Sequence, residues 1–338
     1  MDKHLYTYVL EKYKQCNKPL TAVFEATYGC NLNCIHCYNP SRSQKYYLSL
    51  DEIAFVADQM RQMGIMDITL TGGELFHRSD WFEVAMIFRR IGFTIAIFTN
   101  AVMIDKEVID KLLCIEPLII EVSLYGSSSV YYEQITRVKG SFARFANGLD
   151  LLSTSGLNFV LKPIVLKQNY DDYDAMLAFA ENNGYRLRFE FSPCLLPNGR
   201  NQLDFRLSDA EMVELFGRAS EQRADVGFAK CGIGQSGLVL GPTGDIRPCV
   251  AYPTAAGNIR EQTLEEIWQE SPLFNEVREI SIDDMEACRT CKLNQYCEPC
   301  LALNLLETGN LFSPRENCRI AANRKLALAD DSTKRGEG

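Results

Sequence analysis

The sequence contains no run of apolar residues near the roughly 18 that a membrane-spanning helix requires, so we expect no transmembrane helix. Its first 15 residues lack the apolar core and the small-residue cleavage site of a secretory signal peptide. It also lacks an excess of positive charge, since the formal net charge is −9. An acidic balance argues against nucleic acid or an anionic membrane surface as the main partner. These absences predict a cytoplasmic protein that binds neither nucleic acids nor membranes.

Cysteine, in contrast, is abundant: the 338 residues include 13 cysteines. Disulfides are rare in a reducing cytosol, so clustered cysteines in such a chain favour metal binding. Cys16, Cys114 and Cys194 have no cysteine near them and are interpreted as small buried hydrophobic residues. The other ten fall at tight spacings, and for these we predict metal binding.

Between about residues 20 and 215, short runs rich in β-branched and aromatic residues alternate with stretches of helical periodicity. Such alternation is typical of right-handed βαβ units around a parallel sheet. Six units predict an α/β fold with a partial (β/α)6 TIM-like barrel, whose chemistry lies at the C-terminal ends of the strands. The first helix opens with Ser49 and Glu52, spaced as a capping box. The predicted strands are 21–27, 66–71, 93–99, 118–124, 158–166 and 186–191, and the predicted helices are 49–63, 81–90, 105–113, 142–153 and 171–182.

After about residue 220 this alternation fades, and seven of the remaining residues are cysteines. A small region of this kind is typically held together by metal rather than by a large apolar core. The last nine residues are polar and charged and are expected to be disordered. We therefore expect an N-terminal extension (1–19), a barrel (20–215), a small cysteine-rich domain (216–329) and a disordered tail (330–338).

A three-cysteine motif follows the first predicted strand directly: Cys30, Cys34 and Cys37, in the spacing CxxxCxxC. Three thiolates in one loop can surround one face of a cube-shaped iron–sulfur cluster. They leave the fourth iron open to a substrate or cofactor, as a catalytic zinc keeps an open position. The alternative is a structural cluster or a zinc site. Such sites usually have four ligands, whereas no fourth cysteine or usable histidine is close in sequence, since His36 lies inside the loop.

In this position the motif resembles the signature of the radical S-adenosylmethionine (SAM) superfamily. The resemblance implies a [4Fe–4S] cluster on the three cysteines, whose open iron chelates SAM. It also implies that the reduced cluster cleaves SAM to methionine and a 5′-deoxyadenosyl radical, which abstracts hydrogen from a substrate. A reductant such as flavodoxin or ferredoxin is then a required partner.

Further positions resemble the family in the expected strand order. Gly72, Gly73 and Glu74 follow the second predicted strand and resemble the motif that meets the SAM amino group. Glycine there exposes backbone groups, and a carboxylate accepts hydrogen bonds from an ammonium.

Three more side chains complete the implied SAM pocket. Ser123, at the end of the fourth strand, resembles the contact to the SAM ribose or carboxylate, and Arg137 resembles the carboxylate-binding arginine. His36 occupies the aromatic position near the adenine. Each of these residues alone has an ordinary structural interpretation as a cap, a surface charge or a turn. Together, behind CxxxCxxC, they predict a SAM site.

The C-terminal cysteines resemble the SPASM domain, an extension of radical SAM enzymes that carries auxiliary [4Fe–4S] clusters. The resemblance implies an outer cluster and an inner cluster, with two zinc sites as the alternative. The family commonly has three residues between its fifth and sixth cysteines, whereas Cys297 and Cys300 are separated by two, so the register of Cys300 is open. The implied outer ligands are Cys288, Cys291, Cys297 and Cys318, and the implied inner ligands are Cys231, Cys249 and Cys300.

A fourth ligand for the inner cluster is not evident. The six residues before Cys231 contain no cysteine, although Asp225 is near and Cys194 is more distant. The inner cluster is therefore hypothesised to have an open iron that binds a substrate thiolate.

SPASM enzymes mostly modify peptides or proteins. The resemblance therefore implies a maturase that forms a crosslink in a ribosomally made precursor peptide. Residue oxidation of the sulfatase-maturase type and modification of haem precursors or small molecules are alternatives. A non-catalytic iron–sulfur scaffold is disfavoured by Glu74, Ser123 and Arg137, because an electron carrier needs no SAM pocket.

Recognition of the precursor's leader peptide is expected to depend on another protein, if it occurs. The barrel is predicted to begin within about 20 residues, which is too short for the winged-helix recognition domain of roughly 80 residues found in some peptide maturases. That module is expected to be a separate partner or not to be used.

Overall fold

The structure is a computed structural model that describes residues 3–39, 47–188, 204–219, 232–281 and 284–334. Within these residues an eight-stranded sheet has the strand order β5-β4-β3-β2-β1-β6-β7-β8. Neighbouring strands from β5 to β6 are parallel, and β7 and β8 add antiparallel pairs. The strands are β1 (Thr21–Glu25), β2 (Asp67–Thr71), β3 (Thr94–Thr99), β4 (Ile119–Leu124), β5 (Phe159–Pro163), β6 (Gly237–Leu240), β7 (Asp245–Arg247) and β8 (Gly257–Asn258).

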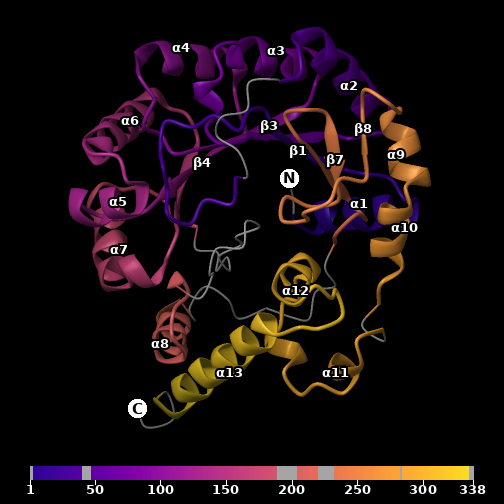
Figure 1. Ribbon diagram of the computed structural model, residues 1–338. Coiled ribbons are helices and arrows are strands. Elements are labelled where there is room, and N and C mark those ends of the chain that lie inside the picture. The colour runs from indigo at the N-terminus through magenta and orange to yellow at the C-terminus, as the bar shows by residue number, and fades with distance from the viewer. Residues whose placement is uncertain (1–2, 40–46, 189–203, 220–231, 282–283, 335–338) are drawn as a thin grey trace.

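Helices cover one side of this sheet. In Figure 1, α2 to α7 form an arc outside the strands, and α12 and α13 lie on the opposite side. This arrangement confirms the predicted partial barrel, in which parallel strands direct their C-terminal ends toward one edge. The helices are α1 (Lys3–Gln15), α2 (Leu50–Gln62), α3 (Trp81–Ile91), α4 (Lys106–Ile115), α5 (Ser129–Thr136), α6 (Ser141–Ser155), α7 (Tyr173–Asn182), α8 (Asp209–Ala219), α9 (Leu264–Glu270), α10 (Pro272–Glu279), α11 (Glu286–Arg289), α12 (Leu301–Thr308) and α13 (Glu316–Lys334).

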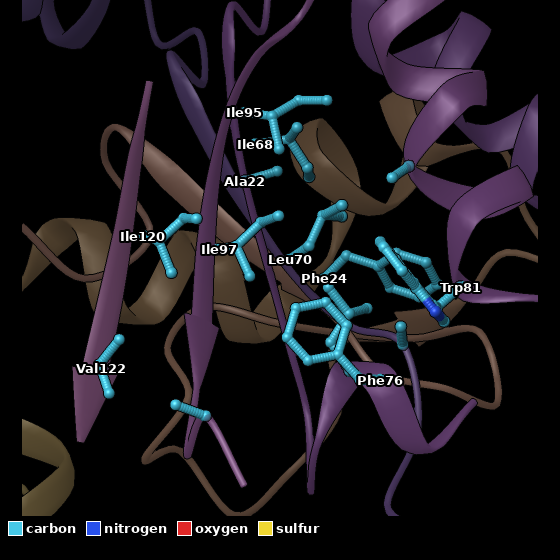
Figure 2. Close-up of a cluster of buried hydrophobic side chains, with 14 of the residues drawn as sticks. Ala22, Phe24, Ile68, Leu70, Phe76, Trp81, Ile95, Ile97, Ile120 and Val122 are labelled. Atoms are coloured by element: carbon cyan, nitrogen blue, oxygen red, sulfur yellow. The ribbon is translucent and has the colours of Figure 1, made fainter. Parts of the chain in front are cut away.

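The two faces of the sheet differ in polarity. Figure 2 shows Phe24 of β1 and Val122 of β4 among buried apolar side chains, together with Trp81 of α3. Because side chains alternate between the two faces of a strand, Glu25 and Ser123 belong to the opposite, inner face. The outer face therefore forms the core with the helices, and the inner face carries polar groups.

The predicted capping box at the start of α2 is confirmed. The Ser49 hydroxyl accepts a hydrogen bond from the Glu52 backbone N–H at 3.2 Å, and the Glu52 carboxylate accepts one from the Ser49 N–H at 2.8 Å. These bonds satisfy two backbone donors that the helix itself leaves unpaired, and so they fix where α2 begins.

The sixth parallel strand differs from the expectation. In the segment predicted as a strand at 186–191, Leu187 forms an isolated parallel bridge with Leu161, and 189–191 lie outside the described residues. The strand beside β1 is instead β6, from the cysteine-rich region, with Thr21 opposite Gly237. An open barrel leaves one edge of its first strand unpaired, and β6 covers that edge.

Two of the isolated cysteines do not have the predicted burial. Cys16 and Cys114 are both exposed, so their interpretation as small buried residues is wrong. Cys16 follows the end of α1. Cys114 lies off the buried stripe of α4, which includes Leu112 and Ile115. Cys194 lies outside the described residues.

The C-terminal region is more regular than expected. Helix α13 extends to Lys334, into the segment predicted to be disordered, and 335–338 lie outside the described residues. Helix α8 spans the expected boundary at residue 215 and packs along α13. Across the described part of the chain, no helix has the length and apolar character needed to cross a membrane.

Candidate functional site

The three-cysteine loop leaves the C-terminal end of β1 and docks on the end of α5. The Asn33 N–H donates to the Thr136 carbonyl at 2.9 Å, and the Ile35 N–H donates to the Ile135 carbonyl at 3.0 Å. Cys34 is buried, whereas Cys30 and Cys37 are half-buried. The loop backbone is therefore fixed against the residues that directly precede Arg137.

Gly72 and Gly73 allow the loop after β2 to lie against the three-cysteine loop. A Cβ atom at Gly72, where φ is +142°, would lie 2.2 Å from the Thr27 carbonyl oxygen, and one at Gly73 would lie 2.4 Å from the Gly29 carbonyl oxygen. The Gly73 N–H donates to the Thr27 carbonyl at 2.7 Å. Side chains at these positions would push the loop away, so glycine is required here by close backbone approach.

Glu74 joins this loop to the end of β3. Its carboxylate accepts hydrogen bonds from the Thr99 hydroxyl at 2.9 Å and from the Asn100 backbone N–H at 2.8 Å. The side chain is buried, and this burial raises its pKa to about 7, although the same hydrogen bonds act to lower it. The Phe76 backbone N–H also donates to this carboxylate at 3.3 Å, so hydrogen bonds from two loops hold Glu74 in place.

Ser123 and His36 meet at one tyrosine. The Ser123 side chain is hydrogen-bonded to Tyr125, and the His36 and Tyr125 rings lie 5.2 Å apart between centroids. Burial of Tyr125, followed by the nearby Cys34 thiolate, raises the pKa of its hydroxyl. The structure thus places two of the predicted SAM contacts beside the three-cysteine loop.

Arg137 follows α5 in the left-handed region, at φ 55°. Its side chain is exposed, and it forms no ion pair with any residue that the structure describes. The preceding Thr136 carbonyl accepts a hydrogen bond from Asn33, so the Arg137 backbone lies next to the three-cysteine loop. The arginine is available for an anionic ligand at this edge.

Asn100 belongs to the site although the sequence analysis did not select it. It directly follows β3 and is buried. Its amide nitrogen lies 2.8 Å from the Asn31 side-chain oxygen and 3.9 Å from the Cys30 sulfur. The signal that could have revealed it is its position, since active sites of these barrels lie at strand C-termini.

Glu25 is the centre of a second buried network that the sequence analysis missed. Its carboxylate accepts hydrogen bonds from the Tyr38 hydroxyl at 2.9 Å and from the Tyr28 hydroxyl at 3.4 Å. Arg247 of β7 forms an ion pair with the same carboxylate, and the Arg247 Nε lies 3.1 Å from the Asp245 carboxylate. Burial, followed by the Glu25 charge, raises the pKa of both tyrosines.

Four of the C-terminal cysteines, the predicted ligands of an outer cluster, lie near enough to one another to interact electrostatically. Burial, followed by the charges of Cys318, Cys288 and Cys291, raises the pKa of Cys297 to about 11. Burial and the thiolates of Cys318 and Cys291 likewise raise the pKa of Cys288. These shifts favour the protonated thiols in the absence of metal, whereas an iron–sulfur cluster bound there would deprotonate them.

The predicted inner ligands are described only in part. Cys249 and Cys300 both pack against a small apolar cluster that includes Ile233 and Leu301. The Cys300 sulfur also accepts the Leu303 N–H at 3.4 Å, at the start of α12. Cys231 and the two candidate fourth ligands, Asp225 and Cys194, lie outside the described residues.

The cysteine geometry also bears on the kind of metal site. Within the described ranges, no three Cys, His, Asp or Glu side chains converge closely enough to hold a single metal ion. A [4Fe–4S] cluster makes a different demand, because each thiolate binds a different iron atom at a corner of a cube. The assignment of these thiols to clusters rests on the spacing of the cysteines along the sequence.

Comparison with known proteins supports this assignment. The radical SAM superfamily model matches residues 24–180, and the SPASM model, described as an iron–sulfur cluster-binding domain, matches residues 231–292. The chain is 25% identical to an AdoMet-dependent heme synthase of Methanosarcina barkeri, over 91% of this chain and 99% of the relative. It is 28% identical to the mycofactocin maturase MftC of Mycolicibacterium smegmatis, over 89% of this chain and 82% of the relative.

A solved structure shares the fold. Streptococcus suis SuiB bound to the precursor peptide SuiA superposes with a TM-score of 0.71 at 18% identity, covering 90% of this chain and 77% of that one. The chain therefore belongs to the radical SAM superfamily, as an enzyme that uses SAM and [4Fe–4S] clusters and carries a C-terminal SPASM domain.

Proposed function

We propose that this enzyme matures a peptide by forming a crosslink within a ribosomally made precursor. The loop of Cys30, Cys34 and Cys37 lies beside Glu74 and the residue before Arg137 at one edge of the barrel, which supports the radical SAM chemistry of this proposal. The relatives point in the same direction, since MftC is named a maturase and SuiB was crystallised with a precursor peptide.

In the proposed site, different side chains of the protein contact the amino-acid end and the adenosine end of SAM. Arg137 binds the SAM carboxylate through its planar guanidinium, and Glu74 accepts from the SAM ammonium. The His36 and Tyr125 pair borders the adenine, and the Ser123 hydroxyl, held by Tyr125, contacts the ribose or carboxylate. When bound on Cys30, Cys34 and Cys37, the reduced cluster supplies the electron that cleaves SAM.

The SPASM domain holds two auxiliary clusters in this proposal. The outer cluster is bound by Cys288, Cys291, Cys297 and Cys318. Burial, followed by neighbouring thiolates of this set, raises the pKa of Cys288, Cys297 and Cys318. The inner cluster is bound by Cys231, Cys249 and Cys300. Crosslinking removes two hydrogen atoms from the peptide: one leaves as an atom to the 5′-deoxyadenosyl radical, the other as a proton and an electron. A cluster held by Cys231, Cys249 and Cys300 would supply an acceptor for that electron.

Two partners complete the proposal. A flavodoxin or ferredoxin delivers the electron to the SAM cluster. Recognition of the leader peptide, if it is required, uses a separate protein.

Haem-precursor modification is a second candidate function. The observation that favours it is the alignment with the heme synthase, which extends over 99% of that relative. The chemistry at the SAM site is the same, so substrate alone separates the two candidates.

The experiment compares the two substrates directly. Anaerobically reconstituted enzyme with SAM and dithionite is incubated with a peptide encoded beside its gene, or with a haem precursor. Loss of two hydrogen atoms from the peptide by mass spectrometry, with formation of 5′-deoxyadenosine, is the expected result. A variant with Cys30, Cys34 and Cys37 replaced by alanine should show neither. Modification of the haem precursor and not of the peptide would contradict the proposal.

A further inference from the structure

The sulfur of Cys30 has two N–H groups directed at it. The Leu32 backbone N–H donates to the Cys30 sulfur at 3.4 Å, and the Asn100 side-chain amide nitrogen lies 3.9 Å from the same atom. The same sulfur lies 3.7 Å from the Asn31 side-chain oxygen, to which the free thiol donates. A cluster-bound cysteine is instead a thiolate, which accepts hydrogen bonds only. Both N–H groups then stabilise its negative charge.

The Asn100 amide is held in the orientation that directs nitrogen toward sulfur. Its side-chain oxygen accepts the Val102 backbone N–H at 3.0 Å, while its nitrogen donates to the Asn31 side-chain oxygen at 2.8 Å. Rotating the amide by half a turn would break both bonds and place an oxygen against the thiolate. Val102 and Asn31 therefore fix which end of the amide meets Cys30.

The backbone of Asn100 is equally constrained. Its N–H donates to the Glu74 carboxylate at 2.8 Å, and its carbonyl accepts from the Tyr132 hydroxyl at 3.4 Å. The residue is only 6% exposed. One residue thus contacts both the carboxylate proposed for the SAM ammonium and a proposed cluster ligand.

We propose that Asn100 is a positioning residue that sets the reduction potential of the SAM-binding cluster through its N–H···S hydrogen bond to Cys30. Reduction adds negative charge to a cluster and its thiolates. Hydrogen bonds to the sulfurs stabilise that charge and raise the potential. The inference rests on Cys30 being a cluster ligand, as proposed above.

Two substitutions test it in the full-length reconstituted protein. Asn100→Ser removes the long amide donor but keeps an oxygen near the Val102 N–H. Asn100→Asp keeps the shape and directs a carboxylate at the thiolate. The SAM cluster is identified by the change that SAM causes in its electron paramagnetic resonance spectrum, and its midpoint potential is measured by redox titration. Both variants should shift to a more negative potential, with the larger shift for Asp.

A matched control separates this effect from general damage to the loop. Asn39 lies in the same loop, but its amide nitrogen donates to the Tyr28 carbonyl at 2.6 Å. Asn39→Ala should therefore keep the wild-type potential. An unchanged potential in both Asn100 variants, with the cluster present, would overturn the proposal. A Cys30→Ala protein that keeps the SAM-responsive signal would instead remove the ligand assignment on which the proposal rests.

Discussion

Arg247 of β7 and Glu25 of β1 form a buried ion pair between the SPASM region and the strand that precedes the three-cysteine loop. The Glu25 side chain is 1% exposed and that of Arg247 is 12% exposed. Arg247 lies two residues before Cys249, and Glu25 lies five residues before Cys30. This ion pair therefore connects the two cysteine-bearing regions through side chains that are largely shielded from solvent.

Replacing Arg247 with methionine should be strongly destabilising. The Glu25 carboxylate would remain buried without a positive partner. Removing one member of a buried ion pair lowers the free energy of unfolding by about 3–5 kcal/mol. Urea unfolding followed by circular dichroism measures the loss. The double variant Glu25→Gln with Arg247→Met should recover part of the stability, because no buried charge remains. If both variants unfold at the same urea concentration as the wild type, the ion pair does not contribute to the free energy of unfolding.

Gly72→Ala should prevent the SAM cluster from loading. The new methyl group would lie 2.2 Å from the Thr27 carbonyl oxygen, which forces the three-cysteine loop to move. Gly92→Ala is the matched control: it also has a positive φ, of +97°, but nothing lies within 4 Å of its Cβ. That control should lose about 1–2 kcal/mol of stability to backbone strain and keep its iron. Equal iron content in the two variants would contradict the close-approach explanation.

Arg137→Leu should weaken SAM binding by about 10- to 150-fold, the equivalent of the roughly 1.5–3 kcal/mol that a hydrogen bond to a charged group contributes. Arg137→Lys should recover only part of the affinity, because an ammonium cannot form the two-pronged contact. Titration of reconstituted protein with SAM measures this. Lys139, exposed two residues further on, supplies the control substitution Lys139→Leu. A similar loss from both leucine variants would indicate a general charge effect instead.

The buried carboxyl of Glu74 should make stability depend on pH. Its pKa is raised from 4.5 to about 7 by burial, so the folded protein binds a proton that the unfolded chain releases. The contribution is most favourable below pH 4.5, falls as the pH rises through this window, and is constant above pH 7. The shift corresponds to about 3 kcal/mol. The measurement is urea unfolding across this range, without SAM, for wild type and Glu74→Gln. The difference in the free energy of unfolding between the two proteins should change by about 3 kcal/mol across this pH range. A difference that stays constant would show that other groups cause the pH dependence.

Reconstituted protein should contain about twelve iron and twelve sulfide per chain, since three clusters carry four of each. Replacing Cys288, Cys291, Cys297 and Cys318 with serine should lower both counts by about a third, and leave SAM cleavage in place. Saturation near four iron, together with two zinc ions, would favour the zinc alternative for the SPASM region.

The inner cluster offers a spectroscopic test of the hypothesised open iron. A thiol-containing substrate should alter the electron paramagnetic resonance signal of an inner cluster with an open iron, because metal coordination deprotonates a thiol outright. The serine form of the same substrate should not. Identical spectra with both substrates would leave electron acceptance as the role of this cluster.

The sequence predicted the parts of the site that depend on local spacing. One loop contains Cys30, Cys34 and Cys37, and Gly72 and Gly73 are adjacent. Each motif can therefore be recognised within a short stretch of sequence. The same holds for the Ser49 capping box, whose two bonds lie within one turn. Strand and helix periodicity likewise gave the first five units of the barrel.

Long-range contacts were not predictable in this way. Asn100 acquires its role through Asn31 and Glu74, which reach it from other loops, and asparagine after a strand is an ordinary turn residue. Glu25 depends on Arg247, far along the chain, and nothing near either residue indicates the pairing. The placement of β6 beside β1 follows from an open sheet edge, which is a property of the assembled barrel.

That placement has a consequence for how the chain is made. During synthesis β1 emerges early, whereas β6, its neighbour opposite β2, emerges only after most of the chain is complete. Until then the backbone N–H and C=O groups along one side of β1 are exposed, and such edges promote pairing with other chains. Pairing across so long a separation is also intrinsically slow. The strand that leads into the three-cysteine loop is thus among the last to be covered, so nascent chains that end before Gly237 should aggregate more readily than the full-length protein.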